Sequence, residues 1–188
     1  MEGCAPPVPD TVERVSSVLG IDVSSHAIDM VKLDETSNDA EWTRFELQGA
    51  DSFTRLRDVR SAMPGVFTFY EDVYIAGIEV PKSRYLKTAA ALFPVYGAVV
   101  ACLPTRLQVW DVHPKTWRQS LGLLGNASKL EVATAVRQIL WDTSERPYDD
   151  WGRWKQDAYD AYAVAYHVRE TNLRAILEEE PHPERNPV

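Results

Sequence analysis

Three short segments near the start of the chain have the apolar patterns of β-strands, and the turns between them are too short to hold a helix. Residues 17–23 form an apolar run that contains one acid, whereas residues 27–33 and 41–47 alternate apolar with polar side chains. Strands this close in sequence pair as an antiparallel meander. Two later strand-like segments, 73–80 and 98–103, alternate with helical patterns, which predicts parallel crossovers. These patterns predict an α/β protein whose mixed five-stranded sheet is flanked by helices.

Helices are expected where apolar residues recur every three to four positions after a capping residue. We expect the first helix, capped by Asp51 or Ser52, to stop before Pro64 and Gly65. The other expected helices cover residues 83–93, 114–121, 128–142 with Ser128 as the cap, and 155–177, and a weaker strand candidate covers 108–112. The ends of the chain are rich in proline and lack periodicity. We therefore expect one domain, 15–178, between flexible tails at 1–14 and 179–188.

The composition excludes several classes of protein. The chain has 188 residues, 45% of them hydrophobic and 26% charged, which suits one folded domain. No apolar run approaches the roughly 18 residues needed to cross a bilayer. Met1 to Asp10 lacks the basic segment of a signal peptide, and two cysteines, Cys4 and Cys102, are too few for a disulfide framework. We expect a cytoplasmic protein without a membrane partner.

The charges are distributed unevenly. The net charge of −8 argues against a nucleic-acid partner, yet residues 80–140 hold eight basic and only two acidic side chains. Two readings stay open: chance clustering on a solvated surface, or a localised surface that binds anions. Lys82 and Arg84 flank the acid Glu79, and either they bind phosphates or they belong to an ordinary solvated helix face.

Four acids occupy positions where carboxylates are costly to bury. Asp22 and Glu79 end two apolar strands, and Asp157 and Asp160 are three residues apart on one helix, on the face that carries small apolar side chains. Taken alone, Asp22 would be better explained as the acceptor of backbone hydrogen bonds from the turn at Ser24 and Ser25. Four acids in one place would repel one another unless they shared a cation.

The types of ligand indicate which cation fits. Carboxylate oxygens without His or Cys suit Mg²⁺, and Mn²⁺ may substitute. Two such ions can activate an attacking water and stabilise the leaving oxygen of a phosphodiester. The chain has no phosphate-binding GxxxxGK[ST] segment and no nucleophilic Ser or Cys pair with His that would compete for the site.

The motifs around these acids resemble the RuvC family of Holliday junction resolvases in the RNase H-like superfamily. The residues that carry the resemblance are LGIDVSS around Asp22, AGIEV around Glu79 and KQDAYDAYAVA around Asp157 and Asp160. Val-Ser replaces the Pro-Gly that follows the first acid in the family. The resemblance covers roughly residues 17–170. It implies an RNase H-like fold and a bacterial or phage nuclease in which Asp22, Glu79, Asp157 and Asp160 hold the catalytic metal ions.

The resemblance also implies partners. By position, Arg118 and Lys129 would take the roles of the family's DNA-contacting basic residues. Both lie within residues 80–140, the segment with an excess of basic side chains. The substrate would be branched DNA, a four-way junction. The protein would act as a homodimer, with the apolar side of the 83–93 helix as the candidate interface. Val80, Pro81 and Lys82 follow the second acid, where the family places an aromatic wedge, so no wedge residue is assigned.

Three other functions stay open beside junction resolution. One is another RNase H-like nuclease that acts on flaps, RNA or RNA–DNA hybrids, and another is a non-catalytic structure-specific DNA-binding protein. An actin-like nucleotide-binding domain ranks last, because the chain lacks a second phosphate loop and the doubled length of that fold. Trp151 and Trp154 either pack or stack on a base or ribose. His167 is expected to be a packing residue or a proton donor.

Overall fold

A computed structural model describes residues 17–82, 85–143 and 154–179. The sheet has five strands in the order β3-β2-β1-β4-β5. Its strands are β1 (Ser17–Val23), β2 (Ala27–Asp34), β3 (Ala40–Glu46), β4 (Ile75–Glu79) and β5 (Gln108–Val112). The first three pair antiparallel, and β4 and β5 join parallel to β1. The predicted meander with parallel crossovers is confirmed.

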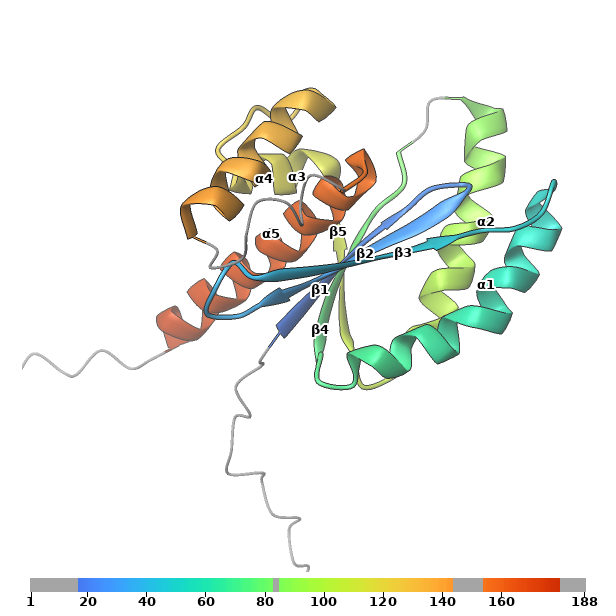
Figure 1. Cartoon of the computed structure of the whole chain (residues 1–188), viewed down its shortest axis with the longest axis horizontal. Coiled ribbons are helices and arrows are strands. Elements are labelled where there is room, and N and C mark those ends of the chain that lie inside the picture. Colours follow the sequence, from blue (N-terminus) through green and yellow to red (C-terminus); the bar gives the residue numbers. More distant parts are fainter. Residues whose placement is uncertain (1–16, 83–84, 144–153, 180–188) are drawn as a thin grey trace, which may run out of the picture.

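Helices cover both faces of the sheet in separate layers (Figure 1). One layer consists of α1 (Ser52–Val66), the 3-10 turn η1 (Phe67–Tyr70) and α2 (Leu86–Cys102), and the other of α3 (Pro114–Ser120), α4 (Lys129–Thr143) and α5 (Gln156–Glu179). Alternate side chains of β1 therefore enter different cores: Leu19 and Ile21 pack with α1 and α2, and Val18 packs with α3 to α5.

Local sequence explains where two helices begin. Asp51 accepts a hydrogen bond from the backbone amide of Thr54 and caps α1 as expected. Ser128 and Glu131 form a reciprocal capping box at the start of α4, because the Ser128 amide donates to the Glu131 carboxylate and the Glu131 amide donates to the Ser128 hydroxyl.

Two sequence expectations about elements are wrong. The stop at Pro64 fails because α1 runs on to Val66, and the following turn buries Phe67 and Tyr70 in the core. The predicted strand over 98–103 is the second half of α2, which contains Pro94. Val95 and Val99, one helical turn apart, are fully buried, whereas Val100 is exposed, so one side of this helix faces the core with helical spacing. The weaker candidate at 108–112 is the fifth strand.

The predicted division into one domain and two tails is not tested, because residues 1–16 and 180–188 lie outside the described residues. In the described part of the chain, no helix combines the length and the apolar character that a membrane span needs.

Candidate metal centre

Two of the four acids are brought together by the parallel pairing of β1 and β4. Asp22 lies one residue before the end of β1 and Glu79 is the last residue of β4. Ile21 pairs with Ile78, so the next residue of each strand reaches the same edge of the sheet. The carboxyl ends of parallel strands are where open α/β sheets place their sites.

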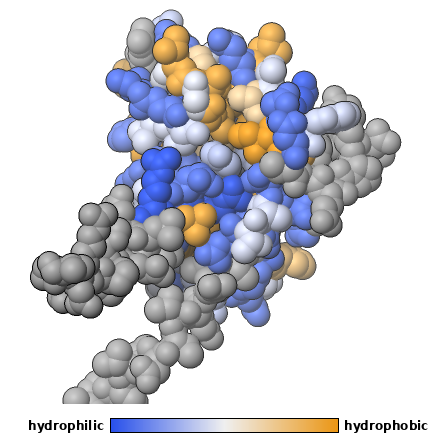
Figure 2. Space-filling view, turned by 90° about the vertical axis from the view of Figure 1, so that its left-hand side faces the viewer, coloured by the Kyte–Doolittle hydropathy of each residue, from blue (hydrophilic) through white to orange (hydrophobic). Residues whose placement is uncertain are grey.

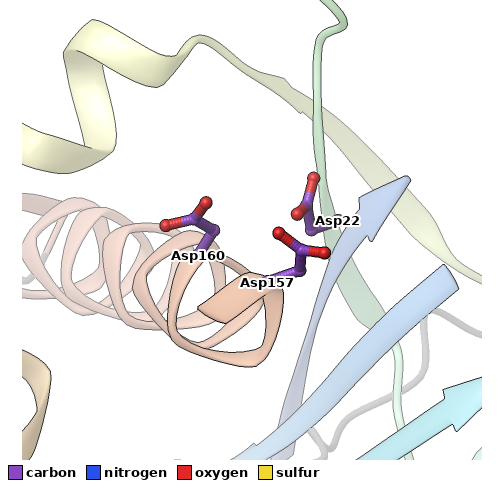
Figure 3. Close-up of side chains that lie close together, drawn as sticks. All are labelled: Asp22, Asp157 and Asp160. Carbon is purple, nitrogen blue, oxygen red and sulfur yellow. The ribbon is translucent and has the colours of Figure 1, made fainter. Parts of the chain in front are cut away.

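The other two acids come from the first two turns of α5 (Gln156–Glu179). Figure 3 shows Asp157 directed toward Asp22 at the end of β1, with Asp160 beside them on α5. One carboxylate oxygen from each of the three side chains lies within 4.8 Å of the others. The structure thus brings together acids that are separated by about 135 residues of chain.

Glycines in the two central strands let α5 come this close. A Cβ at Gly20 would overlap the carbonyl oxygen of Ala161 and lie 2.6 Å from the amide nitrogen of Ala165. A Cβ at Gly77 would lie 2.6 Å from Val168. Because these two strand positions carry no side chain, α5 can lie close to the sheet. This close packing fixes the distance of α5 from the sheet, and with it the position of Asp157 and Asp160.

The acids raise one another's pKa values. Burial raises the pKa of Asp22 well above its ordinary value, and the charges of Glu79, Asp160 and Asp157 raise it further. Burial and Asp160 raise the pKa of Glu79 to about 7. Burial also raises the pKa of Asp160, although Lys129 opposes the shift. A cluster of this kind is stable as carboxylates only with added positive charge.

Lys129 supplies part of that charge. Its Nζ lies 2.8 Å from Asp157 Oδ1 and 3.4 Å from Asp160 Oδ2. Burial alone would lower the pKa of this ammonium group, but the contacts with Asp157 and Asp160 raise it above its ordinary value. The Arg118 guanidinium lies on the ring of Trp117, 4.3 Å from the ring centroid. Its positive charge partly opposes the rise in the pKa values of Glu79 and Asp160.

The hydrogen bonds of Glu79 and Asp160 leave carboxylate oxygens that could bind a cation. Trp117 is fully buried, and its Nε1 donates a hydrogen bond of 2.8 Å to Glu79 Oε2. Asp160 Oδ1 is buried without a hydrogen-bond partner among the described residues. An unpartnered buried carboxylate oxygen is costly, and coordination of a cation would satisfy it. The acidic triad and its oxygen ligands fit a hard divalent cation.

A fifth acid, which was not among the four predicted, adjoins the cluster. Asp29 on β2 pairs in register with Asp22 and is fully buried. It accepts hydrogen bonds from Trp42 Nε1 at 2.9 Å and from Arg44 Nη1 at 2.7 Å. The same Arg44 nitrogen lies 3.8 Å from Asp157 Oδ2. The sequence analysis missed Asp29 and Arg44, although an acid among the apolar residues of the predicted strand 27–33 was a visible signal.

With this geometry the chain can be compared with known proteins. No family model matches it, and no curated protein matches it in sequence. RuvC of Thermus thermophilus superposes with a TM-score of 0.64 at 20% identity, over 84% of this chain and 96% of that chain. The same protein in complex with Holliday junction substrate gives 0.64 at 18% identity, over 84% and 95%. The chain has the RuvC fold.

A mitochondrial protein has this fold as well. The yeast mitochondrial Holliday junction resolvase Ydc2 superposes with a TM-score of 0.58 at 14% identity, over 90% of this chain and 88% of that chain. The RuvC fold confirms the predicted RNase H-like mixed sheet. It also confirms, at the level of structure, the resemblance first visible in three motifs.

The predicted DNA-contacting residues have different surroundings within the RuvC fold. Arg118 and Lys129 adjoin the acids, as described above. Lys82 is exposed three residues beyond Glu79, and Arg84 lies outside the described residues. Lys129 is therefore positioned to meet a phosphate only if its ammonium group leaves Asp157 and Asp160.

Two further sequence interpretations are resolved. Trp154 is buried in an aromatic cluster, 5.7 Å from Tyr159 and 6.3 Å from Trp42 between ring centroids, so base stacking by Trp154 is wrong. Trp151 lies outside the described residues. His167 packs on α3, where its Nδ1 lies 2.6 Å from Ser120 Oγ, and burial lowers its pKa. This supports the packing role.

Proposed function

We propose that this protein is a metal-dependent endonuclease that resolves four-way DNA junctions. The observation that carries the proposal is the convergence of Asp22, Glu79, Asp157 and Asp160 at the carboxyl ends of two parallel strands, within a RuvC fold. Two of the similar structures are described as a Holliday junction resolvase and as RuvC with Holliday junction substrate.

Each acid has a proposed role as a ligand of divalent ions, Mg²⁺ by preference. When bound, such ions activate a water and stabilise the leaving oxygen of a phosphodiester. Asp22, Asp157 and Asp160, whose carboxylate oxygens lie within 4.8 Å of one another, would hold such an ion between β1 and α5. Trp117 would hold the Glu79 carboxylate in one orientation through its hydrogen bond to Oε2.

The basic side chains beside the acids have a proposed role in DNA binding. A divalent ion would displace the Lys129 ammonium group from Asp157 and Asp160 by charge repulsion. Lys129 would then be available to a phosphate of the bound strand, together with Arg118. Lys82 and Arg84 would extend this contact along the strand beyond Glu79.

A cleavage assay tests the proposal. A four-way junction, plain duplex, flap and RNA–DNA hybrid are incubated with the protein in Mg²⁺ and in a chelator. We expect Mg²⁺-dependent paired cuts in the junction, and we expect Asp22→Asn to bind the junction without cutting it. Faster cleavage of flap or hybrid would indicate another nuclease of this fold. Binding of the junction without cleavage by the unaltered protein would indicate a structure-specific binding protein instead.

A further inference from the structure

A pocket lies beside the acids at the carboxyl ends of β4 and β5. Residues 80–82, which follow β4, form one wall, and residues 113–116, which follow β5 and begin α3, form the other. Its volume is about 490 Å³, within the range of small-molecule sites. The walls are held together because the Val80 amide donates a 2.9 Å hydrogen bond to the Val112 carbonyl.

The two segments that line the pocket adjoin residues of the candidate metal centre in the chain. Val80 follows Glu79 directly, and Glu79 pairs in register with Val112. Trp117, one residue beyond the second wall, donates its hydrogen bond to Glu79. A strand that places one phosphodiester at the acids would therefore pass its neighbouring nucleotide over this pocket.

The lining has the chemistry of a nucleotide site. Val80, Pro81 and Pro114 provide apolar surface for a sugar or base, and Lys82 and Lys115 provide positive charge for a phosphate. The residues that line the pocket include no acid. Positive charge at the entrance therefore favours an anionic occupant.

Lys115 is held in place by a glycine on the next segment of chain. A Cβ at Gly125 would overlap Cγ of Lys115 and lie 3.2 and 3.3 Å from its Cδ and Cε. The aliphatic stem of Lys115 thus lies across the bare backbone of Gly125. A lysine with a restricted stem loses less side-chain entropy when it binds a phosphate than a free surface lysine does.

We propose that this pocket binds the nucleotide next to the scissile phosphodiester, with its phosphate at Lys115 and Lys82 and its sugar and base on the apolar floor. This inference rests on the proposed nuclease function and adds a subsite to it. Lys115 was not among the DNA-binding residues predicted from sequence, because its spacing resembles that of any exposed helical lysine.

Binding measurements test the subsite without depending on cleavage. Fluorescence anisotropy with a labelled four-way junction, in Ca²⁺ and over a series of salt concentrations, is compared for the unaltered protein, Lys115→Ala, Gly125→Ala and the double variant. Arg57→Ala on the opposite layer is the matched control, since it also removes one exposed positive charge.

We expect Lys115→Ala to weaken binding roughly three- to tenfold and to lower the salt slope by about one unit. Gly125→Ala should weaken binding by displacing Lys115, and it should have no further effect once Lys115 is alanine. If Lys115→Ala binds as Arg57→Ala does while the unaltered protein binds and cuts the junction, the subsite is wrong and the nuclease proposal stands. If the unaltered protein binds no branched DNA, the nuclease proposal fails, and the subsite fails with it.

Discussion

The residues of the acidic cluster stabilise the fold less than their burial would suggest. Asp22, Glu79 and Asp160 all have raised pKa values because burial and mutual repulsion disfavour their charged forms. An acid whose pKa is raised on folding contributes most to stability below its unfolded pKa, and the contribution is lost as the pH rises through the folded value. For Glu79 that window runs from its ordinary value of 4.5 to about 7.

We therefore predict that the metal-free protein loses stability as the pH rises from about 4.5 to about 7. In a chelator, Glu79→Gln should be more stable than the unaltered protein at pH 8, by on the order of 2 kcal/mol, and this gain should vanish near pH 4.5. Glutamine retains an oxygen that can accept the Trp117 hydrogen bond. Thermal unfolding over this pH range measures both. A gain that is independent of pH would contradict the assigned pKa shift. Above pH 7, Mg²⁺ should stabilise the unaltered protein more than Glu79→Gln, which retains the other three acids.

Arg44 is the residue that connects the hidden acid Asp29 to the cluster. Because Asp29 is fully buried, removal of its arginine would leave a carboxylate with one remaining hydrogen bond, from Trp42. We predict that Arg44→Met lowers the free energy of unfolding by about 3 kcal/mol. Asp29→Asn in the same chain should recover most of that loss, as urea unfolding of the two single variants and the double variant would show. Additive losses would mean that the two side chains do not interact.

At the scale of elements, the contact between α5 and the central strands fixes the site. The absence of a side chain at Gly20 allows α5 to lie directly on β1. We predict that Gly20→Ala lowers the free energy of unfolding by roughly 1–3 kcal/mol and reduces cleavage, because α5 must move away and carry Asp157 and Asp160 with it. Gly65→Ala on α1 is the control.

The control separates crowding from a general effect of alanine. A Cβ at Gly65 would meet nothing within 4 Å. Gly65→Ala should therefore raise the free energy of unfolding by roughly 0.5–1 kcal/mol, because alanine suits a helix better than glycine does. Denaturant unfolding and cleavage rates are measured on both variants. Equal stability of Gly20→Ala and the unaltered protein would show that α5 does not depend on this close approach.

The helices and strands also show which parts of the fold can be predicted from sequence patterns. Alternation over 27–33 and 41–47 predicted the meander. β3 keeps a visible period because it is partly exposed, whereas β2 is buried almost throughout and alternates because Asp29 and Lys32 stand among its apolar residues. The run at 98–103 is apolar throughout and therefore carries no period, whereas in the structure α2 continues through Pro94 as far as Cys102. Asp22 and Asp160 were found from motifs, but the pairing of Asp29 with Arg44 depends on the register of two strands, which no local pattern specifies.

At the scale of the whole molecule, two surfaces expose large apolar side chains to solvent. Figure 2 shows hydrophobic side chains among hydrophilic ones on the layer of α3 and α4, where Leu124, Leu130 and Trp141 are exposed. On the opposite layer, Leu86, Phe93 and Val100 of α2 are exposed at intervals of seven residues, with the exposed Ala90 and Gly97 between them. A seven-residue apolar spacing keeps side chains on one face of a helix.

The α2 stripe bears on how a junction would be cut. A four-way junction has two symmetry-related strands to cut, and the described residues form one carboxylate cluster of this kind. Two copies about a two-fold axis would place two clusters at matched positions. The stripe of Leu86, Phe93 and Val100 begins in the 83–93 segment that the sequence analysis named as the candidate interface, and it lies on the layer away from the acids.

We predict that the protein is a homodimer that associates through this stripe. Sedimentation at micromolar protein should give a dimer mass, and Leu86→Glu or Phe93→Glu should give a monomer, because a charge would be buried without a partner at the interface. Phe69→Glu is the matched control, since Phe69 is 80% exposed on η1, away from the stripe. The monomeric variants should nick one strand of a junction instead of making paired cuts. A monomer of the unaltered protein, both alone and with a junction, would contradict the dimer and favour single-strand nicking, whereas a dimer that survives both stripe substitutions would place the interface elsewhere.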